Sequence, residues 1–258
     1  MTKCVILAGG LGTRLSEETI NKPKPMVEIG GKPILWHIMQ HYSFYGIKEF
    51  IICLGYKGYQ IKEFFLNFNL YNSDITIDIK KNKLLSKKEN LPDWKVSLID
   101  TGLETMTGGR ILRLREILKS EKNFFLTYGD GLSNVNLNSL MKHHLTQKKI
   151  ATVTVVTPPG RFGSIKISGK SVTSFQEKLD NINSLINGGF LVLNNKIFKY
   201  LEDDTTIFEQ EPLVNLTKNN QLSAFYHNKF WHAVDTLRDK NYLNKLWYDG
   251  KPPWKIWK

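Results

Sequence analysis

Two patterns are almost absent from this sequence: paired cysteines and long apolar runs. Cys4 and Cys53 are the only cysteines among 258 residues, and each lies in a short apolar, strand-like run. Two isolated cysteines suit neither a disulfide framework nor a zinc site, so we expect buried free thiols. No apolar run has the length of a membrane span, and the N-terminal residues lack a signal-peptide pattern. We therefore expect a soluble, cytoplasmic protein without a membrane partner.

The chain also lacks a compact basic cluster, although its formal net charge is +12. Its positive charges are scattered, without the interleaved aromatic residues typical of surfaces that bind nucleic acid. A lysine-rich solvated surface is the favoured interpretation, an anionic small substrate is the second, and no nucleic-acid partner is expected. The six histidines, among them His37 and His232, form no metal-ligand pattern.

In the first 150 residues, short apolar runs alternate with amphipathic segments. We expect strands at 3–8, 49–55, 75–79, 95–100 and 123–128. Helices are expected at 33–46, 59–68 and 110–120, the last two with the apolar stripes Ile61, Phe64, Phe65, Phe68 and Ile111, Leu114, Ile117, Leu118. This alternation predicts an α/β fold with a Rossmann-like, mostly parallel mixed sheet that carries helices on both faces.

After about residue 150 the pattern becomes richer in β structure. Short β segments are expected at 151–163, 164–168, 171–178, 188–194 and 221–235, and helices at 195–201, 209–218 and 237–247. Neither a linker nor an internal repeat separates the two parts. We therefore expect a single domain over 1–258, with halves at about 1–150 and 151–258.

A glycine-rich loop, LAGGLGTRL at 7–15, directly follows the first expected strand. In an open parallel sheet, ligands bind beyond the carboxyl ends of the strands. Glycines let the backbone approach a ligand, and exposed N–H groups can then cradle phosphate. Arg14 adds a planar cation suited to phosphate oxygens. The loop matches neither the dinucleotide fingerprint nor a P-loop, so by itself it is a weak signal, and a tight strand-to-helix turn is the less favoured alternative.

Two Lys-Pro pairs follow at 22–25. Proline disfavours helix for itself and for the preceding residue, so we expect a rigid, extended strap. Such a strap can aim Lys22 or Lys24 over the glycine loop. Two solvated lysines in a stiffened loop are the alternative.

The glycine loop followed by KPKPM resembles the signature of the nucleotide-sugar pyrophosphorylases, the sugar-1-phosphate nucleotidyltransferases. The segments GGR at 108–110, YGDG at 128–131, FQEK at 175–178, INGGF at 186–190 and WHAVDT at 231–236 agree with it, so the resemblance covers nearly the whole chain. It implies a nucleotide-binding first half and a sugar-phosphate-binding second half. It further implies transfer of the cytidylyl group from CTP to α-D-glucose 1-phosphate, Mg²⁺ as cofactor, and a homo-oligomer.

For the nucleotide, the resemblance implies that Arg14 holds the β- and γ-phosphates and that Lys24 lies near the α-phosphate, with Lys22 as the less favoured candidate. Capping of the helix expected at 110–118 is the alternative role of Thr105 and Thr107. The implied nucleotide-binding set is Leu7, Ala8, Gly9, Gly10, Leu11, Gly12, Thr13, Arg14, Lys24, Thr105, Thr107, Gly109, Arg110 and Gly129.

Two carboxylates, Asp130 and Asp235, are the Mg²⁺ ligands that the resemblance implies. A hard cation on triphosphate oxygens commonly uses one or two carboxylates, phosphate and water. A turn residue is the alternative for Asp130, and helix capping with Thr236 and Asp239 is the alternative for Asp235.

For the sugar phosphate, the implied set is Tyr128, Glu177, Lys178, Asn187, Gly188 and Gly189. Leu179 stands where many relatives have proline, which puts the fit of the sugar in question. A nucleotidyltransferase for another nucleotide or sugar phosphate is the alternative function, and a non-catalytic relative is a further one. The aromatic segments at 64–71 and 247–257 either cover an interface between subunits or pack within one chain.

Overall fold

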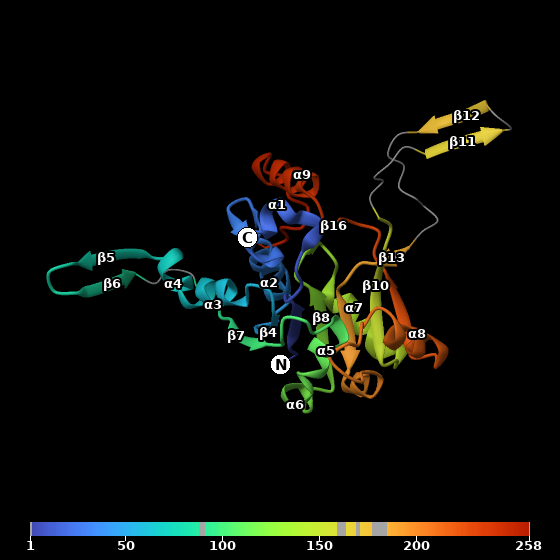
Figure 1. Cartoon of the computed structure of the whole chain (residues 1–258), viewed down its shortest axis with the longest axis horizontal. Helices are drawn as coiled ribbons and strands as arrows, with labels where there is room; N and C mark the ends of the chain where they lie inside the picture. Colours follow the sequence, from blue (N-terminus) through green and yellow to red (C-terminus); the bar gives the residue numbers. More distant parts are fainter. Residues whose placement is uncertain (1, 88–90, 159–163, 169–170, 177–184, 258) are drawn as a thin grey trace.

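The computed structural model describes residues 2–87, 91–158, 164–168, 171–176 and 185–257 (Figure 1). Eight described strands form the central sheet, in the order β13-β10-β14-β8-β1-β4-β7, with β15 paired to β10. Their bounds are β1 Cys4–Leu7, β4 Glu49–Leu54, β7 Lys95–Asp100, β8 Asn123–Tyr128, β10 Ala151–Val156, β13 Ile186–Asn187, β14 Leu191–Asn194 and β15 Leu222–Tyr226. Both halves of the chain thus contribute strands to one sheet.

The sheet is mixed, as predicted. The β1–β4, β1–β8, β4–β7 and β10–β15 pairs are parallel, whereas β14 is antiparallel to both β8 and β10, and β13 is antiparallel to β10. The parallel strands β8, β1, β4 and β7 belong to the first half of the chain. Their carboxyl ends therefore lie along one edge, where a ligand site is expected.

The apolar run of β1 is explained by burial on both faces of the sheet. Cys4 and Ile6 belong to one core, and Val5 and Leu7 to the other. The first core contains residues of the helices α2 Ile34–Phe44, α3 Gly58–Leu66, α7 Leu137–Gln147 and α9 Leu237–Tyr248. The second contains residues of α5 Thr107–Leu112, α6 Arg115–Leu118, α8 Glu211–Lys218 and the 3₁₀ helix η3 Asn195–Tyr200.

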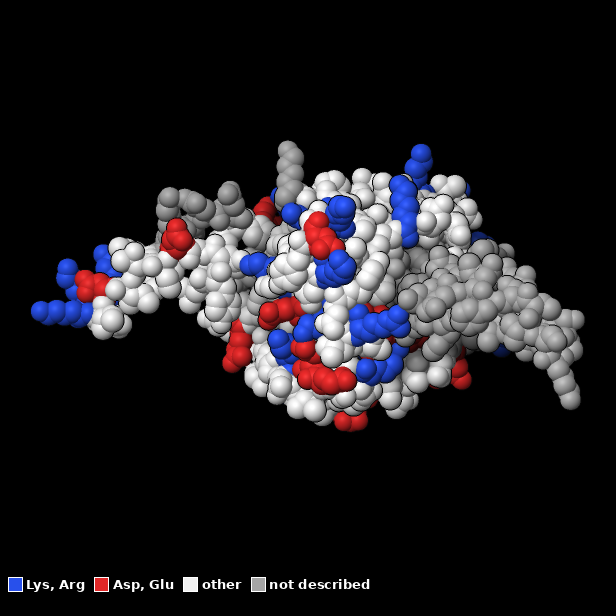
Figure 2. Space-filling view, turned by 90° about the horizontal axis from the view of Figure 1, so that it is seen from above, with Lys and Arg blue, Asp and Glu red and all other residues white. Residues whose placement is uncertain are grey.

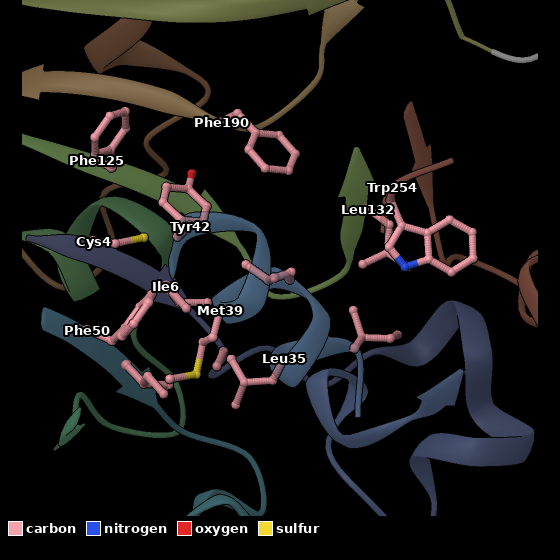
Figure 3. Close-up of a cluster of buried hydrophobic side chains, with 14 of the residues drawn as sticks. Cys4, Ile6, Leu35, Met39, Tyr42, Phe50, Phe125, Leu132, Phe190 and Trp254 are labelled. Atoms are coloured by element: carbon pink, nitrogen blue, oxygen red, sulfur yellow. The ribbon is translucent and has the colours of Figure 1, made fainter. Parts of the chain in front are cut away.

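Aromatic rings pack among aliphatic side chains in the first core beside α2 (Figure 3). The ring of Tyr42 stacks on Phe190 with 6.0 Å between centroids and meets Phe125 edge-on at 5.6 Å. Trp254 is almost fully buried, and its indole N–H donates to Nδ1 of His37 on α2. The C-terminal aromatic segment thus packs within this chain at Trp254.

Short elements and hairpins complete the fold. Two hairpins project from the body in Figure 1, β5 Asp74–Asp78 with β6 Lys83–Lys87 and β11 Ser164–Ser168 with β12 Ser171–Gln176. The other short elements are η1 Thr13–Leu15, α1 Ser16–Thr19, η2 Lys24–Met26, β2 Glu28–Ile29, β3 Lys32–Pro33, α4 Phe68–Tyr71, β9 Gly131–Ser133 and β16 Trp231–Ala233.

Several local predictions are corrected by the structure. The helix expected at 110–120 is two short helices, α5 and α6, and Ile117 of its apolar stripe is 38% exposed. The expected helix at 59–68 ends at Leu66, and the one at 195–201 is the 3₁₀ helix η3. Helix α7 was not predicted, because its buried face includes the polar His144 and so gives a weak apolar periodicity.

Both cysteines are free and buried, as predicted, and burial raises the pKa of Cys53 to about 12. Within the described ranges, none of the helices has the length and apolar character needed to span a bilayer. Figure 2 shows Lys and Arg side chains interspersed with Asp and Glu on the face in view. The scattered charge of the sequence is therefore also scattered on this surface.

Candidate functional site

Two adjacent pockets open at the carboxyl ends of β1 and β8. The first, of about 380 Å³, is lined by the glycine loop, the strap and the segment at 105–110. The second, also of about 380 Å³, is lined by 186–190, Trp231, Glu209 and neighbouring residues. Arg14, Tyr128 and Asp130 line both pockets. Most residues predicted for the nucleotide line the first pocket, although Leu11 and Gly109 line neither pocket. Of those predicted for the sugar phosphate, Tyr128, Asn187, Gly188 and Gly189 line the second.

The glycine loop has the backbone conformation that its sequence requires. Gly12 has φ +68°, in the left-handed region that glycine tolerates without strain. A Cβ on Gly9 would lie 2.2 Å from the guanidinium of Arg110, so only glycine fits there. The N–H of Ala8 donates to the carbonyl of Cys53 in the sheet, at 3.0 Å. Donors available to a phosphate therefore begin after Ala8.

Arg110 clamps this loop from behind. Its guanidinium donates to the carbonyls of Gly9, Leu54, Gly102 and Leu103 and to the hydroxyl of Thr101, at 2.7–3.2 Å. Arg110 is 4% exposed, and burial lowers its pKa below the ordinary value. The residue lines the first pocket, as predicted, but its N–H groups point to protein oxygens. In this geometry Arg110 ties the glycine loop, through Gly9, to the end of β4 and to residues 101–103.

The two predicted metal ligands are brought together by a small ladder. Asp130 follows β8, and Asp235 follows β16; β9 and β16 pair antiparallel with Gly131 opposite Ala233. The N–H of Val234 also donates to the carbonyl of Asp130 at 2.9 Å. The cap of α9 is formed by Thr236 and Asp239, whose side chains make both bonds of a capping box. Asp235 supplies neither of these side-chain bonds; it lines the second pocket, and its carboxylate accepts from Arg14 and Lys24.

Lys24 bridges the two carboxylates. Its Nζ lies 2.6 Å from Oδ2 of Asp130 and 2.8 Å from Oδ1 of Asp235, and the residue is 8% exposed. Burial alone would lower the pKa of Lys24, but the two carboxylates outweigh it and raise the pKa above its ordinary value. Arg14 donates to Oδ2 of Asp235 at 2.9 Å, with most of its side chain exposed. Two cations and two carboxylates therefore meet where the pockets join.

The structure separates Lys24 from Lys22. The ammonium of Lys22 lies 3.5 Å from a carboxylate oxygen of Glu28, and Lys22 is not part of the lining of either pocket. The strap is extended at Pro23 but turns as the 3₁₀ helix η2 from Lys24, so it is not extended throughout as expected. That turn directs Lys24 inward.

The segment at 105–110 forms the wall opposite the strap. Thr105, Met106 and Thr107 line the first pocket, whereas Gly109 is buried behind them and donates its N–H to the carbonyl of Thr206 at 3.2 Å. No side-chain cap is present at the start of α5, so the capping role considered for the threonines is not observed. The hydroxyl of Thr107 donates to Glu209 at 2.6 Å instead.

The second pocket contains Asn187, Gly188 and Gly189 together with Tyr128. The indole N–H of Trp231 donates to the carbonyl of Gly188 at 2.6 Å and so fixes this turn. Glu177 and Lys178, predicted for the sugar phosphate, lie outside the described residues, as does Leu179. The structure therefore locates only the other residues predicted for the sugar phosphate, Tyr128, Asn187, Gly188 and Gly189.

Glu209 and Trp231 are among the residues of the second pocket that sequence reasoning missed. Trp231 stands at the start of the WHAVDT segment, which was a usable signal. Glu209 gave no local signal, because an acidic residue before a helix is commonly explained by the helix dipole.

Comparison with known proteins defines the class. The family model described as nucleotidyl transferase matches residues 3–249. The chain belongs to the nucleotidyl transferase family.

Among curated proteins, the chain is similar to glucose-1-phosphate cytidylyltransferase of Salmonella typhi, with 53% identity over 255 residues and 99% of each chain covered. It is 45% identical to the probable glucose-1-phosphate cytidylyltransferase of Bacillus subtilis, over 99% of this chain and 100% of that protein. Among solved structures, HddC from Yersinia pseudotuberculosis superposes with a TM-score of 0.70 at 26% identity, over 96% of this chain and 100% of that one. UDP-glucose pyrophosphorylase, at 18% identity and a TM-score of 0.68 over 97% of this chain and 99% of that one, supports the fold alone.

Proposed function

We propose that this protein is a glucose-1-phosphate cytidylyltransferase, which converts CTP and α-D-glucose 1-phosphate into CDP-glucose and pyrophosphate. The observation that carries the proposal is the 53% identity to an enzyme of that name along 99% of both chains. The geometry supports it, since two pockets of similar size share the wall that bears Arg14, Tyr128 and Asp130. Two substrates bound side by side need such an arrangement.

In this assignment the first pocket takes CTP and the second takes the sugar phosphate. A phosphate oxygen of glucose 1-phosphate attacks the α-phosphorus of CTP in line, and pyrophosphate leaves. Positioning and electrostatic stabilisation supply most of the rate in such a transfer. Arg14 holds the β- and γ-phosphates with its exposed guanidinium, and Lys24 neutralises the α-phosphate. The clamped glycine loop offers its N–H groups without having to reorganise.

Asp130 and Asp235 are proposed to hold Mg²⁺. One oxygen of each lies within 2.8 Å of the Lys24 ammonium, so the two carboxylates face the same point. Two carboxylates with room for phosphate and water are a donor set that suits this ion. When bound, Mg²⁺ neutralises charge on phosphate oxygens. Since Arg14, Lys24 and the two aspartates together carry no net charge, the anionic substrates require this extra positive charge.

We also propose that the protein forms a homo-oligomer in the cytoplasm. The β5–β6 hairpin carries exposed apolar side chains that are otherwise costly in water: Ile75, Ile77, Leu84 and Leu85 are 42–58% exposed. A second copy of the chain is the proposed cover, and light scattering after gel filtration measures the mass. A monomer at micromolar concentration contradicts this part of the proposal. The cytoplasmic location is proposed because both thiols are free and buried.

The proposed function is tested by pyrophosphate release from CTP, UTP, dTTP and ATP, each with and without glucose 1-phosphate. CTP is expected to exceed UTP in kcat/KM by at least about tenfold, because an unsatisfied buried polar group costs about 1–3 kcal/mol. Equal values for CTP and UTP contradict the choice of base but leave nucleotidyl transfer intact. No release with any pair indicates a non-catalytic protein.

A further inference from the structure

Glu209 lies between the two pockets and is bonded to a residue of each. Its Oε2 accepts from the hydroxyl of Thr107, which lines the first pocket, at 2.6 Å. Its Oε1 accepts from the phenol of Tyr128, which lines both. Glu209 itself lines the second pocket and is exposed there. The carboxylate is therefore fixed at two points while it faces the proposed sugar-phosphate site.

The fixed carboxylate keeps unused acceptor capacity. A carboxylate offers about four lone-pair directions, and the bonds from Thr107 and Tyr128 use two of them. Burial and the adjacent Glu209 raise the pKa of Tyr128 far above its usual range, so the phenol stays protonated and acts as the donor. Because these bonds hold Glu209 in one geometry, little conformational entropy is lost when a ligand donates to it.

The chemistry of this position suits a hydroxyl group rather than a phosphate. Arg14 lies at the shared wall with most of its side chain exposed, so it is the cation there that an anionic group can approach. A phosphate next to the Glu209 carboxylate would meet like charge, whereas neutral sugar hydroxyls can donate to it. The sugar ring of the substrate is therefore the group expected at Glu209.

The two partners of Glu209 differ in their other support. The hydroxyl of Thr107 also accepts a bond from the N–H of Phe208 at 2.9 Å, and the N–H of Gly108 donates to the carbonyl of Thr206 at 2.8 Å. The phenol of Tyr128 otherwise has a long contact of 3.5 Å from the amide of Asn187. Loss of Glu209 should therefore leave Thr107 of the first pocket in place and free the phenol of Tyr128 at the wall that both pockets share.

We propose that Glu209 is a specificity-determining residue whose carboxylate accepts a hydrogen bond from one hydroxyl group of the sugar 1-phosphate. This inference rests on the proposed function, since it needs a sugar phosphate in the second pocket. It assigns a substrate contact to a residue outside the segments that carry the family resemblance.

The test compares wild-type protein and Glu209→Ala with glucose 1-phosphate and its 2-, 3-, 4- and 6-deoxy analogues. With glucose 1-phosphate, the variant should raise the KM of the sugar phosphate about tenfold to a hundredfold and the KM of CTP less than about threefold. With one deoxy analogue, wild type and variant should have equal kcat/KM, because the donor of the bond is already missing. Glu202→Ala removes an exposed carboxylate from the same segment between η3 and α8, and its KM values should match those of wild type.

An equal loss with every analogue would show that Glu209 acts only by packing and would overturn the proposal, as would unchanged kinetics. If Glu209→Ala does not fold, Glu209→Gln replaces it in the test, because it preserves the shape and one acceptor oxygen. This variant should give a smaller loss of kcat/KM with the same pattern across the analogues. Wild-type turnover of CTP with glucose 1-phosphate tests the proposed function separately. If another sugar phosphate is the substrate, the ratios are measured on its deoxy analogues.

Discussion

Replacing Lys24 with alanine tests the centre of the site, because it removes the ammonium that bridges Asp130 and Asp235. In the proposed transfer, Lys24 stabilises charge that develops at the α-phosphate. A well-placed transition-state charge contributes on the order of 3 kcal/mol, which corresponds to about a hundredfold in kcat. Steady-state pyrophosphate release at saturating CTP and glucose 1-phosphate measures this loss.

The same substitution should also change stability in a way that the structure specifies. Breaking a buried ion pair on one side costs about 3–5 kcal/mol. The lower end applies here, because Arg14 still donates to Asp235 and the Asp130 side chain is 28% exposed. About 3 kcal/mol corresponds to a fall in Tm of roughly 6–12 °C for a chain of this length. Mg²⁺ should raise the Tm of Lys24→Ala more than that of wild type, since the carboxylate pair has lost its internal cation.

Lys22→Ala is the matched control, because it removes an equal charge from the same strap. Lys22 makes only a partly exposed pair with Glu28 at 3.5 Å, worth about 0–1 kcal/mol. Its kcat and Tm should therefore stay close to those of wild type. A folded Lys24→Ala protein with near-normal kcat refutes the assignment of Lys24, and a large loss in Lys22→Ala transfers the role to that residue.

The remaining predictions concern the metal ligands, the glycine loop and pH. Asp130→Asn and Asp235→Asn should each raise the Mg²⁺ concentration for half-maximal rate by about tenfold, as loss of one charged ligand contact predicts; an unchanged requirement in either variant removes that residue from the metal site. Gly9→Ala should lower Tm, because its Cβ would lie 2.2 Å from the clamping guanidinium, whereas Gly10→Ala meets no atom within 4 Å and should keep Tm while raising the KM of CTP; equal Tm values in the two variants contradict the clamp. The pKa of His37 is lowered from 6.5 to about 4, mainly by burial, so the unfolded chain takes up its proton first as pH falls. The resulting contribution of His37 to the free energy of unfolding, about 3 kcal/mol, is fully present above pH 6.5 and is lost as the pH falls toward 4. If Tm falls as steeply with pH in His37→Gln as in wild type, His37 is excluded as the source of this pH dependence.

The parts of this site that depend on local chemistry could be predicted from sequence. Gly12 needs positive φ, and its loop follows a buried strand, so the loop was found from residue type and position alone. The mixed sheet followed from alternating periodicities. Lys24 and Lys22 stayed alternatives, because the sequence does not show where η2 turns the strap inward.

The parts that depend on tertiary contacts could not be predicted in the same way. Asp130 and Asp235 are 105 positions apart in the sequence and meet through the β9–β16 ladder, whose three-residue strands give no periodic signal. The resemblance supplied that pair. Arg110 was expected on the nucleotide, but its guanidinium donates to five protein oxygens, two of them, on Gly9 and Leu54, far away in the sequence. The residue type indicated an anion-binding group at position 110. Only the fold shows that the guanidinium of Arg110 donates to protein oxygens.

The burial of Trp254 against α2 affects how the newly made chain can fold. A ribosome delivers the N-terminal part of a protein first, and domains fold as units during synthesis. Helix α2 is thus made early. The buried indole of Trp254, which donates to His37 on this helix, comes from near the other end of the described chain. Until Trp254 has emerged, His37 lacks this partner, so packing on this side of α2 is completed only late in synthesis.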